Sequence, residues 1–380
     1  MTGIYIHIPF CKSRCIYCAF YSTTNGEMRQ KYIDAVCHEM KIRSESEAKE
    51  QGSKNNVATV YVGGGTPSQL TAPQLRQLFS SLYIIYKVET DAEITVECNP
   101  DDVTEELAAL LVQLGVNRVS MGAQTFDDTR LRFLRRRHDA SQVSLAINRL
   151  RKAGIRNISI DLMYGFPNET LNQWKRDIDA ALSLNVEHIS AYCLMVEEGT
   201  ALYERIRNGG NADMHECDED LERQMYYLLI DRLNAAGYEH YEISNFAIPG
   251  YRSRHNSSYW TDVPYIGLGA AAHSYDGIHR QWNVSDLNKY IIGIENGTPS
   301  FEGETLTDND RYNDRVMLCL RTCEGLPLDH LSAADRTYLQ TAARKYLDEG
   351  LLQLADGHLR LTRKGLFVSD MVMSDLMRIS

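Results

Sequence analysis

IYIHIPFCKSRCIYCAF, residues 4–20, joins an apolar segment to a tight group of three cysteines. Residues 4–8 are rich in isoleucine and predict a β-strand. Cys11, Cys15 and Cys18 follow with the spacing C-x3-C-x2-C, which allows the three thiolates to reach one metal centre. Metal centres built from cysteine usually have four ligands, so this stretch leaves the fourth ligand to be found.

Two metal centres fit three cysteines in a loop that follows a strand. The first is a structural zinc ion with His7, Cys37 or His38 as its fourth ligand. The second is a cubane iron–sulfur cluster in which one iron has no protein ligand. The spacing alone leaves both alternatives open.

The first 240 or so residues alternate between short β-rich runs and amphipathic segments. The expected strands are 4–8, 57–62, 92–97, 116–122, 155–165 and 186–194. Segments with helical periodicity lie between them, at 27–50, 71–86, 104–114, 141–153 and 170–184. Such alternation predicts an α/β fold with a parallel sheet. Because no strand is followed by G-x-G-x-x-G, we expect a partial or full β/α barrel.

The pattern changes near residues 290–305, where helices become dominant. Helices expected at 310–323 and 332–348 precede a hairpin with its turn at Asp356 and Gly357, and a last helix follows. This order predicts a smaller, helical C-terminal domain of the winged-helix type. We therefore expect a barrel core over 1–240, a completing segment of strands and loops over 241–300, and the winged-helix-like domain over 301–380.

Composition narrows the class of protein further. The chain has 380 residues, of which 43% are hydrophobic and 24% charged, as in soluble globular proteins. It contains no apolar run near the ~20 residues that span a bilayer and no signal peptide pattern, so we expect a cytoplasmic protein. A net charge of -11 argues against nucleic acid as the main partner.

Two later segments supply further candidate ligand groups. YVGGGTPS ends the second expected strand with Gly63, Gly64, Gly65 and Thr66, whose backbone amides can approach a carboxylate or amino group closely. The third expected strand ends at Glu97, and in β/α barrels this end of the strands faces the active site. The structural alternatives are a tight turn for the glycines and a solvated strand end for Glu97.

Taken in order, C-x3-C-x-Y-C, GGGTP and E-x-N-P resemble the radical S-adenosylmethionine (SAM) superfamily. The resemblance implies a [4Fe-4S] cluster on Cys11, Cys15 and Cys18, with SAM chelating the open iron through its amino and carboxylate groups. It also implies an electron donor for the cluster. An open iron is chemically required, since the cluster must touch the sulfonium to pass an electron to it.

A longer set of motifs is similar to the anaerobic coproporphyrinogen III oxidase family, over most of residues 3–285. These motifs are HIPFCKSRCIYCAFYS, YVGGGTPS, ECNPDD, RVSMGAQTFDD, LRRRHDA and ISIDLMYGFP. Members of that family can hold two SAM molecules. By motif position, the resemblance implies that the first SAM is bound by Tyr5, Tyr17, Gly64 and Glu97. It implies that the second is bound by Gly65, Thr66, Gln124, Arg136 and Asp161.

The implied roles match the chemistry of the side chains. Tyr5 and Tyr17 can cover an adenine or a sulfonium with their rings. Glu97 can accept hydrogen bonds from an amino group, and Arg136 can hold a carboxylate in a fork. The structural alternatives are a solvated basic patch for the arginine run and a strand-end cap for Asp161.

Two features differ from the true oxidases. Phe20 occupies the position where oxidases carry a further cysteine, and nothing before the first strand corresponds to their N-terminal extension. Both differences indicate the branch of the family whose members act as heme chaperones instead of oxidatively decarboxylating coproporphyrinogen.

RSRHNSSYW, residues 252–260, matches the H-N-x-x-Y-W signature of that heme chaperone branch. The resemblance implies a heme site at His255, Asn256, Tyr259 and Trp260. An imidazole can ligate heme iron and the rings can face the macrocycle, while Arg252 and Arg254 can pair with the propionates. His273 is a rival ligand. The structural alternative is an aromatic turn in which His255 bonds to a backbone carbonyl.

These features predict a heme chaperone with a radical-SAM-type core that delivers heme to an acceptor protein. The first alternative is an oxygen-independent coproporphyrinogen III oxidase. The second is a radical SAM enzyme that modifies nucleic acid, which the winged-helix-like C-terminus suggests and the acidic balance disfavours.

Overall fold

The computed structural model describes residues 2–51, 56–207 and 217–378. Its centre is a twelve-stranded sheet with the strand order β12-β11-β10-β9-β1-β2-β3-β4-β5-β6-β8-β7. Six strands run parallel in chain order, and they are β1 (Thr2–Ile8), β2 (Asn56–Gly64), β3 (Lys87–Cys98), β4 (Arg118–Gln124), β5 (Asn157–Tyr164) and β6 (His188–Cys193). Because β6 pairs with β8 and β1 pairs with β9, the parallel strands form a partial barrel.

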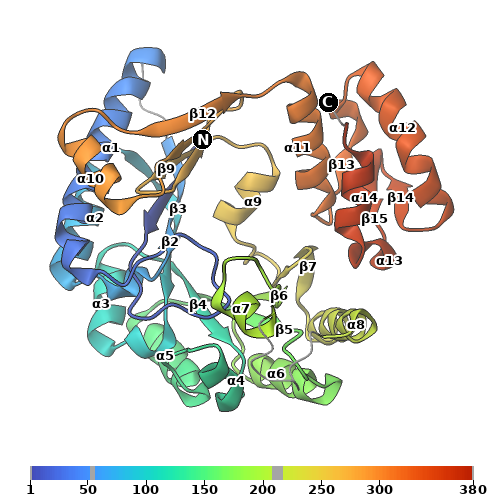
Figure 1. Cartoon of the computed structure of the whole chain (residues 1–380), viewed down its shortest axis with the longest axis horizontal. Coiled ribbons are helices and arrows are strands. Elements are labelled where there is room, and N and C mark those ends of the chain that lie inside the picture. Colours follow the sequence, from blue (N-terminus) through green and yellow to red (C-terminus); the bar gives the residue numbers. More distant parts are fainter. Residues whose placement is uncertain (1, 52–55, 208–216, 379–380) are drawn as a thin grey trace.

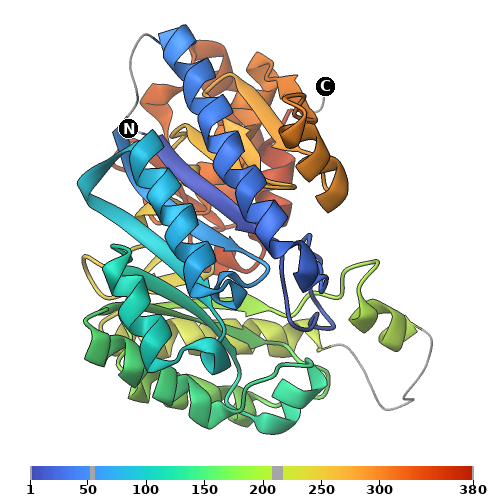
Figure 2. The same cartoon turned by 90° about the vertical axis from the view of Figure 1, so that its left-hand side faces the viewer.

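Helices join the parallel strands and cover their outer face, as Figures 1 and 2 show. The main ones are α1 (Arg29–Gln51), α2 (Ala72–Ile85), α3 (Glu105–Gln113), α5 (Ala140–Ala153), α6 (Leu171–Ser183) and α8 (Glu219–Ala235). The local sequence determines where α5 and α6 begin, since Asp139 and Thr170 each form a capping box with a glutamine three residues later. Among the described residues, none of the helices has the length and apolar character needed to cross a bilayer.

Further strands extend both edges of the parallel sheet. β7 (Glu239–Glu242) and β8 (Asn245–Ala247) form an antiparallel pair beside β6. On the other edge, β9 (Tyr265–Leu268) runs parallel to β1, and three antiparallel strands continue from it, namely β10 (His273–Tyr275), β11 (His279–Asn283) and β12 (Phe301–Thr305). Helix α10 (Leu287–Glu295) lies between β11 and β12 in the chain and packs against α1.

The segment expected to hold only strands and loops contains α10 and a second helix, α9 (Arg254–Trp260). The Ser253 hydroxyl caps it by accepting from the N–H of Asn256 at 3.3 Å. Glu93 of β3 accepts from the backbone N–H groups of Arg254 and His255, both at 2.9 Å. The stabilising carboxylate comes from a strand that is distant in sequence, so local pattern did not predict this helix. Two other short helices, α4 (Asp128–Phe133) and α7 (Ala201–Arg207), were also not expected.

A separate hydrophobic cluster forms the C-terminal part of the molecule. Helices α11 (Asp308–Leu320), α12 (Ala333–Asp348), α13 (Arg363–Leu366) and α14 (Ser369–Leu376) accompany the small sheet of β13 (Leu326–Pro327), β15 (His358–Leu361) and β14 (Leu352–Ala355). Its hairpin turns at Asp356 and Gly357, whose φ angles are 52° and 76°. The predicted α/β class, the barrel and the helical C-terminal domain are therefore confirmed. The residue boundaries of the three expected parts stay a prediction.

Candidate functional site

A cavity opens where the parallel strands end, and the predicted cluster and SAM residues all line it. They are Tyr5, Cys11, Cys15, Tyr17, Cys18, Gly64, Gly65, Thr66, Glu97, Gln124, Arg136 and Asp161. Five strands and the loops that follow them contribute these side chains. The fold thus brings the separate sequence motifs to one place, as expected for the carboxyl end of a β/α barrel.

The three cysteine side chains are half-buried in this cavity. The Cys11 sulfur accepts a hydrogen bond from the Thr66 hydroxyl at 3.5 Å, and the Cys15 sulfur accepts one from Arg136 at 3.6 Å. Burial raises the pKa of the Cys11 and Cys18 thiols. In the described part of the chain, no three His, Cys, Asp or Glu side chains form a group that could hold a single metal ion. Three thiols along a cavity wall suit a larger group, such as a cluster that gives each thiolate its own iron.

The zinc alternative is not supported by its three candidate fourth ligands. Both ring nitrogens of His7 have partners, the Tyr5 hydroxyl and the Tyr21 carbonyl oxygen, each at 3.0 Å. Cys37 belongs to the hydrophobic core, and His38 is exposed on α1. The donor set in the cavity therefore fits the cubane cluster better than zinc.

In the glycine run at the end of β2, the backbone amides of Gly64 and Gly65 are already bonded within the protein. The N–H of Gly64 donates to Glu97 Oε2 at 2.9 Å, and the N–H of Gly65 donates to the Ile8 carbonyl oxygen at 2.8 Å. A Cβ atom at Gly64, where φ is +107°, would lie 2.4 Å from the His7 ring. A Cβ atom at Gly65 would lie 2.8 Å from the Ile8 carbonyl oxygen. Glycine is therefore needed here because β2 approaches β1 closely and because this approach fixes Glu97.

Two carboxyl groups line the cavity and have raised pKa values. Burial raises the pKa of Glu97 to about 7, although the Tyr61 hydroxyl donates to its Oε1 at 2.7 Å and lowers the pKa in part. Burial also raises the pKa of Asp161 to about 6, against the lowering effect of Arg118. A desolvated carboxyl group gains most from an arriving cation, because the cation relieves the penalty on its charge. The cavity is thus suited to an ammonium or sulfonium group.

The arginine run in LRRRH divides into three environments. Arg135 is exposed, and its φ of 60° turns the backbone there. Arg136 enters the cavity, where one nitrogen donates to Asn99 Oδ1 at 2.8 Å and to a carbonyl oxygen of β4 at 2.6 Å. Its Nε is buried and has no hydrogen-bond partner among the described residues. Arg137 forms ion pairs with the acidic residues 101–102. A solvated basic patch is therefore not what the structure shows.

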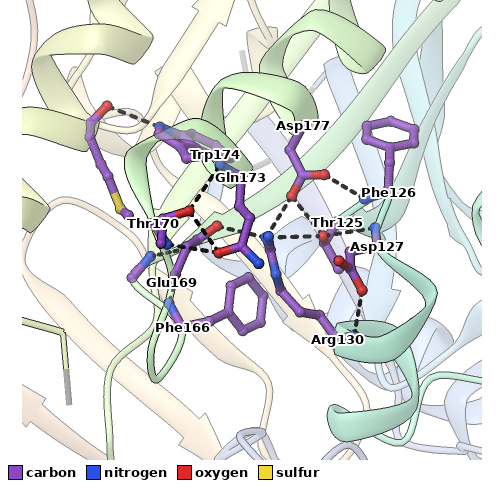
Figure 3. A network of polar contacts seen from close by, with 12 residues as sticks. Thr125, Phe126, Asp127, Arg130, Phe166, Glu169, Thr170, Gln173, Trp174 and Asp177 are labelled. Atoms are coloured by element: carbon purple, nitrogen blue, oxygen red, sulfur yellow. Dashed lines mark hydrogen bonds and ion pairs between the residues drawn. The ribbon is translucent and has the colours of Figure 1, made fainter. Parts of the chain in front are cut away.

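A buried ion network fixes the segment that carries Arg136 (Figure 3). Arg130 of α4, whose side chain is 11% exposed, lies 2.6 Å from Glu169 and 3.0 Å from Asp177. Glu169 also accepts from the N–H of Gly165 at 2.8 Å. These contacts tie the loops after β4 and β5 to α6. They therefore fix the backbone of the segment that carries Arg136. This network could not be predicted from the sequence, because its members lie far apart in the chain.

Several cavity residues escaped the sequence-based prediction. They include Ser13, Arg14, Ser22, Cys98, Asn99, Ser120 and Gly122. Asn99 could have been found, since it follows Glu97 at the end of an expected strand. Ser120 and Gly122 carry no comparable signal, because they lie within β4 and the face they take depends on how β4 pairs with β3 and β5.

The H-N-x-x-Y-W segment lies away from the cysteines, on α9. His255 is 0% exposed, and its Nδ1 and Nε2 lie 2.8 Å from the hydroxyl groups of Thr59 and Tyr259. Burial lowers the pKa of His255 to about 3, so the imidazole is neutral. An iron atom would have to displace one of the two hydroxyl partners. The partners are side chains, whereas the structural alternative had expected a backbone carbonyl.

The other residues considered for heme do not converge on His255. Asn256 is half-buried on α9, and Trp260 lines a second cavity, with its ring 6.2 Å from that of Tyr241. Arg252 forms ion pairs with two glutamates, and the exposed His273 stacks on a tryptophan ring at 5.7 Å. Arg254 donates to a backbone carbonyl of β3. The heme role of this segment stays a prediction.

The fold and the cavity of three cysteines define a radical SAM protein. A family model for the radical SAM superfamily matches residues 5–181, and one for the HemN C-terminal domain matches residues 306–368. The chain is 34% identical to the heme chaperone HemW of Bacillus subtilis (strain 168), over 96% of both chains. It is 36% identical to the heme chaperone HemW of Mycobacterium tuberculosis (strain CDC 1551 / Oshkosh), over 99% of this chain and 94% of that one. This chain belongs to the HemW family.

The fold also matches a solved structure. Coproporphyrinogen III oxidase (HemN) from Escherichia coli, a radical SAM enzyme, aligns with a TM-score of 0.85. The alignment covers 99% of this chain and 90% of that one, at 22% sequence identity. At this identity the match establishes the shared fold.

Proposed function

We propose that this protein is a heme chaperone, which binds heme and transfers it to an acceptor protein. The observation that carries the proposal is the 34–36% identity to curated heme chaperones over 96–99% of the chain. Phe20 supports it, because a 70% exposed phenyl ring at the cavity edge takes the place of the additional cysteine of the oxidases. The chain would act in the cytoplasm, and its acceptor would be a heme-requiring protein.

The cavity at the strand ends fits a [4Fe-4S] cluster with SAM. Cys11, Cys15 and Cys18 would hold the cluster, which when bound supplies one-electron chemistry at the SAM sulfonium. Glu97 would accept from the amino group of SAM. The unpartnered Nε of Arg136 is a donor for a carboxylate. An electron donor protein would be the remaining partner.

Four of the seven remaining predicted SAM contacts are side chains on different strands or loops. Tyr5 lies on β1 with its hydroxyl 3.0 Å from His7, and Tyr17 lies in the cysteine loop. Both rings can cover the adenine or the sulfonium. Gln124, at φ 67°, is placed in the cavity by the bulge of β4 and offers an amide to a second SAM. Asp161 offers its carboxylate from β5. We retain 1–240, 241–300 and 301–380 as the functional parts.

One oxygen-free preparation of the full chain tests this proposal. Iron and acid-labile sulfide are expected at about four of each per chain. Titration with heme is expected to give a Soret band that saturates at one equivalent. Zinc in place of iron would contradict the cluster, and no saturable heme binding would contradict the chaperone. If coproporphyrinogen with SAM and reductant yields protoporphyrinogen, the protein is instead an oxidase.

A further inference from the structure

A second cavity, of about 730 Å³, lies between the barrel and the C-terminal domain. Tyr241 and Trp260 line it from the barrel side, and Leu318, Arg315 and His358 line it from the C-terminal side. Figure 1 shows α9, which carries Trp260, between the barrel strands and α11. A volume of this order falls in the range of ~300–1,000 Å³ that proteins use for bound cofactors and other small molecules.

We propose that this cavity binds heme and that Nε2 of His358 is an axial ligand of the heme iron. The proposal rests on the heme chaperone function and gives that function a site. The cavity is distinct from the cysteine cavity, with which it shares no lining residue.

The His358 ring is already oriented for metal binding. Its Nδ1 lies 2.9 Å from the carbonyl oxygen of Asp356. A carbonyl oxygen can only accept, so Nδ1 carries the proton and Nε2 carries the lone pair. No partner of Nε2 is found in residues 2–51, 56–207 and 217–378. Histidines that ligate metals commonly have this arrangement, in which a backbone carbonyl fixes the ring through the other nitrogen.

The walls of the cavity suit a flat macrocycle with acidic substituents. The Trp260 ring provides apolar surface on one side, and Leu318 of α11 lies on the other. Tyr241, whose ring lies 6.2 Å from that of Trp260, is only 2% exposed and has Arg252 over its ring. Arg315 donates to the His330 carbonyl oxygen at 3.1 Å, and within the described ranges no carboxylate lies within ion-pair distance of it. Its guanidinium group is therefore free to pair with a propionate.

Two of the three acidic residues that line the cavity are already paired with arginines other than Arg315. Asp314 is paired with Arg280, and Glu324 is paired with Arg252. Asp262 accepts a hydrogen bond from Tyr275. Arg315 is thus the lining cation that a ligand carboxylate can reach without breaking an existing ion pair.

The proposed site also gives the buried His255 a structural role within the H-N-x-x-Y-W segment. His255 links Thr59 of β2 to Tyr259 and so holds α9 in place, and Trp260 follows in the chain. In this arrangement the signature supplies a wall of the heme cavity through Trp260, while the C-terminal domain supplies the ligand.

A titration of the full-length protein with ferric heme tests the site, with His358→Ala and the matched control His330→Ala. His330 lines the same cavity, but its ring has no orienting hydrogen bond in the described structure. For His358→Ala we expect a shifted Soret band and heme binding weaker by about tenfold or more. For His330→Ala we expect the band and the affinity of the unchanged protein.

A second variant, Leu318→Trp, fills the cavity and leaves both histidines in place. It is expected to weaken heme binding. If circular dichroism shows that His358→Ala does not fold, Leu318→Trp tests the heme site in its place. Heme binding by the unchanged protein with equal affinity in His358→Ala and Leu318→Trp would overturn the site and leave the chaperone function standing. Absence of heme binding by the unchanged protein would overturn the chaperone function itself.

Discussion

The two cavities of this molecule are built in different ways. The cysteine cavity is formed by loops that follow consecutive parallel strands of one sheet, and its lining includes thiols, carboxyl groups and arginines. The second cavity lies between the barrel and the C-terminal domain. It also contains carboxyl groups, arginines and Cys319, but its lining adds two histidines, the Trp260 ring and the side chain of Leu318. The first is suited to hold a reactive cofactor rigidly. The second can open if the two domains separate, which is useful for a site that must release its ligand.

A short series of contacts leads from α9, beside the second cavity, to the cysteine cavity. The Tyr259 hydroxyl contacts His255, whose ring stacks on Tyr61 with centroids 5.3 Å apart. The Tyr61 hydroxyl in turn donates to Glu97 in the cysteine cavity. These contacts are partly buried, and they anchor α9 to the barrel. The following variants separate the two cavities experimentally.

The largest effect is expected from Cys15→Ser. A serine oxygen is a poor ligand for the iron of a cubane, so the [4Fe-4S] absorbance should be lost completely. Heme affinity should stay unchanged, because the heme cavity contains none of the three cysteines. Anaerobic absorption spectra and heme titration of the same sample provide the measurement. Loss of heme binding together with the cluster would show that the two cavities are one functional unit.

Arg130→Met should produce the next largest effect, on the free energy of unfolding. The change leaves Glu169 and Asp177 buried without their cation, and breaking such a buried pair costs about 3–5 kcal/mol. Arg223→Met is the control, since its exposed pair with Asp220 contributes about 0–1 kcal/mol. Denaturant unfolding measures both. Equal destabilisation by the two changes would mean that the buried network stabilises the fold no more than an exposed ion pair does.

Glu97→Gln should change how SAM binding depends on pH. The pKa of Glu97 is raised to about 7, so the group is ionised at pH 8 and mostly protonated at pH 6. SAM binding through the ionised form should therefore weaken by about tenfold per unit as the pH falls below 7. Calorimetric titrations from pH 6 to 8 should show this dependence in the unchanged protein, and Asp161→Asn should move it to lower pH, because the charge of Asp161 helps to raise the pKa of Glu97. A dependence that persists in Glu97→Gln would assign it to another group.

Arg315→Gln should give the smallest effect. One half-exposed ion pair with a propionate contributes about 1 kcal/mol, which corresponds to roughly fivefold in heme affinity. The Soret band should keep its position, because the iron ligand is unchanged. Arg252→Gln is the comparison, and it should matter less for heme because that guanidinium is already paired with two glutamates. A larger effect from Arg252→Gln would indicate that the propionate pairs with Arg252 and not with Arg315.

Much of the fold and of the first cavity could be predicted from the sequence. Strand–helix alternation predicted the barrel, and the motif ECNPDD places Glu97 directly at a strand end. The glycine run was located correctly, but the hydrogen bonds of its backbone amides within the protein were not predicted, since close packing of β1 and β2 is not visible in a single segment. The ion network around Arg130 was missed for the same reason.

The sequence by itself determined the elements that depend on neighbours in the chain: the parallel strands, the capped helices, the hairpin at Asp356 and Gly357, and the spacing of the cysteines. Only the tertiary structure decided which side chains share a cavity and which polar groups are already satisfied. It buried His255 between Thr59 and Tyr259, and it placed His358 in a cavity with Trp260. The physical reason is that hydrogen bonding and burial are set by residues far apart in sequence, and these determine whether a histidine is a structural support or a free ligand.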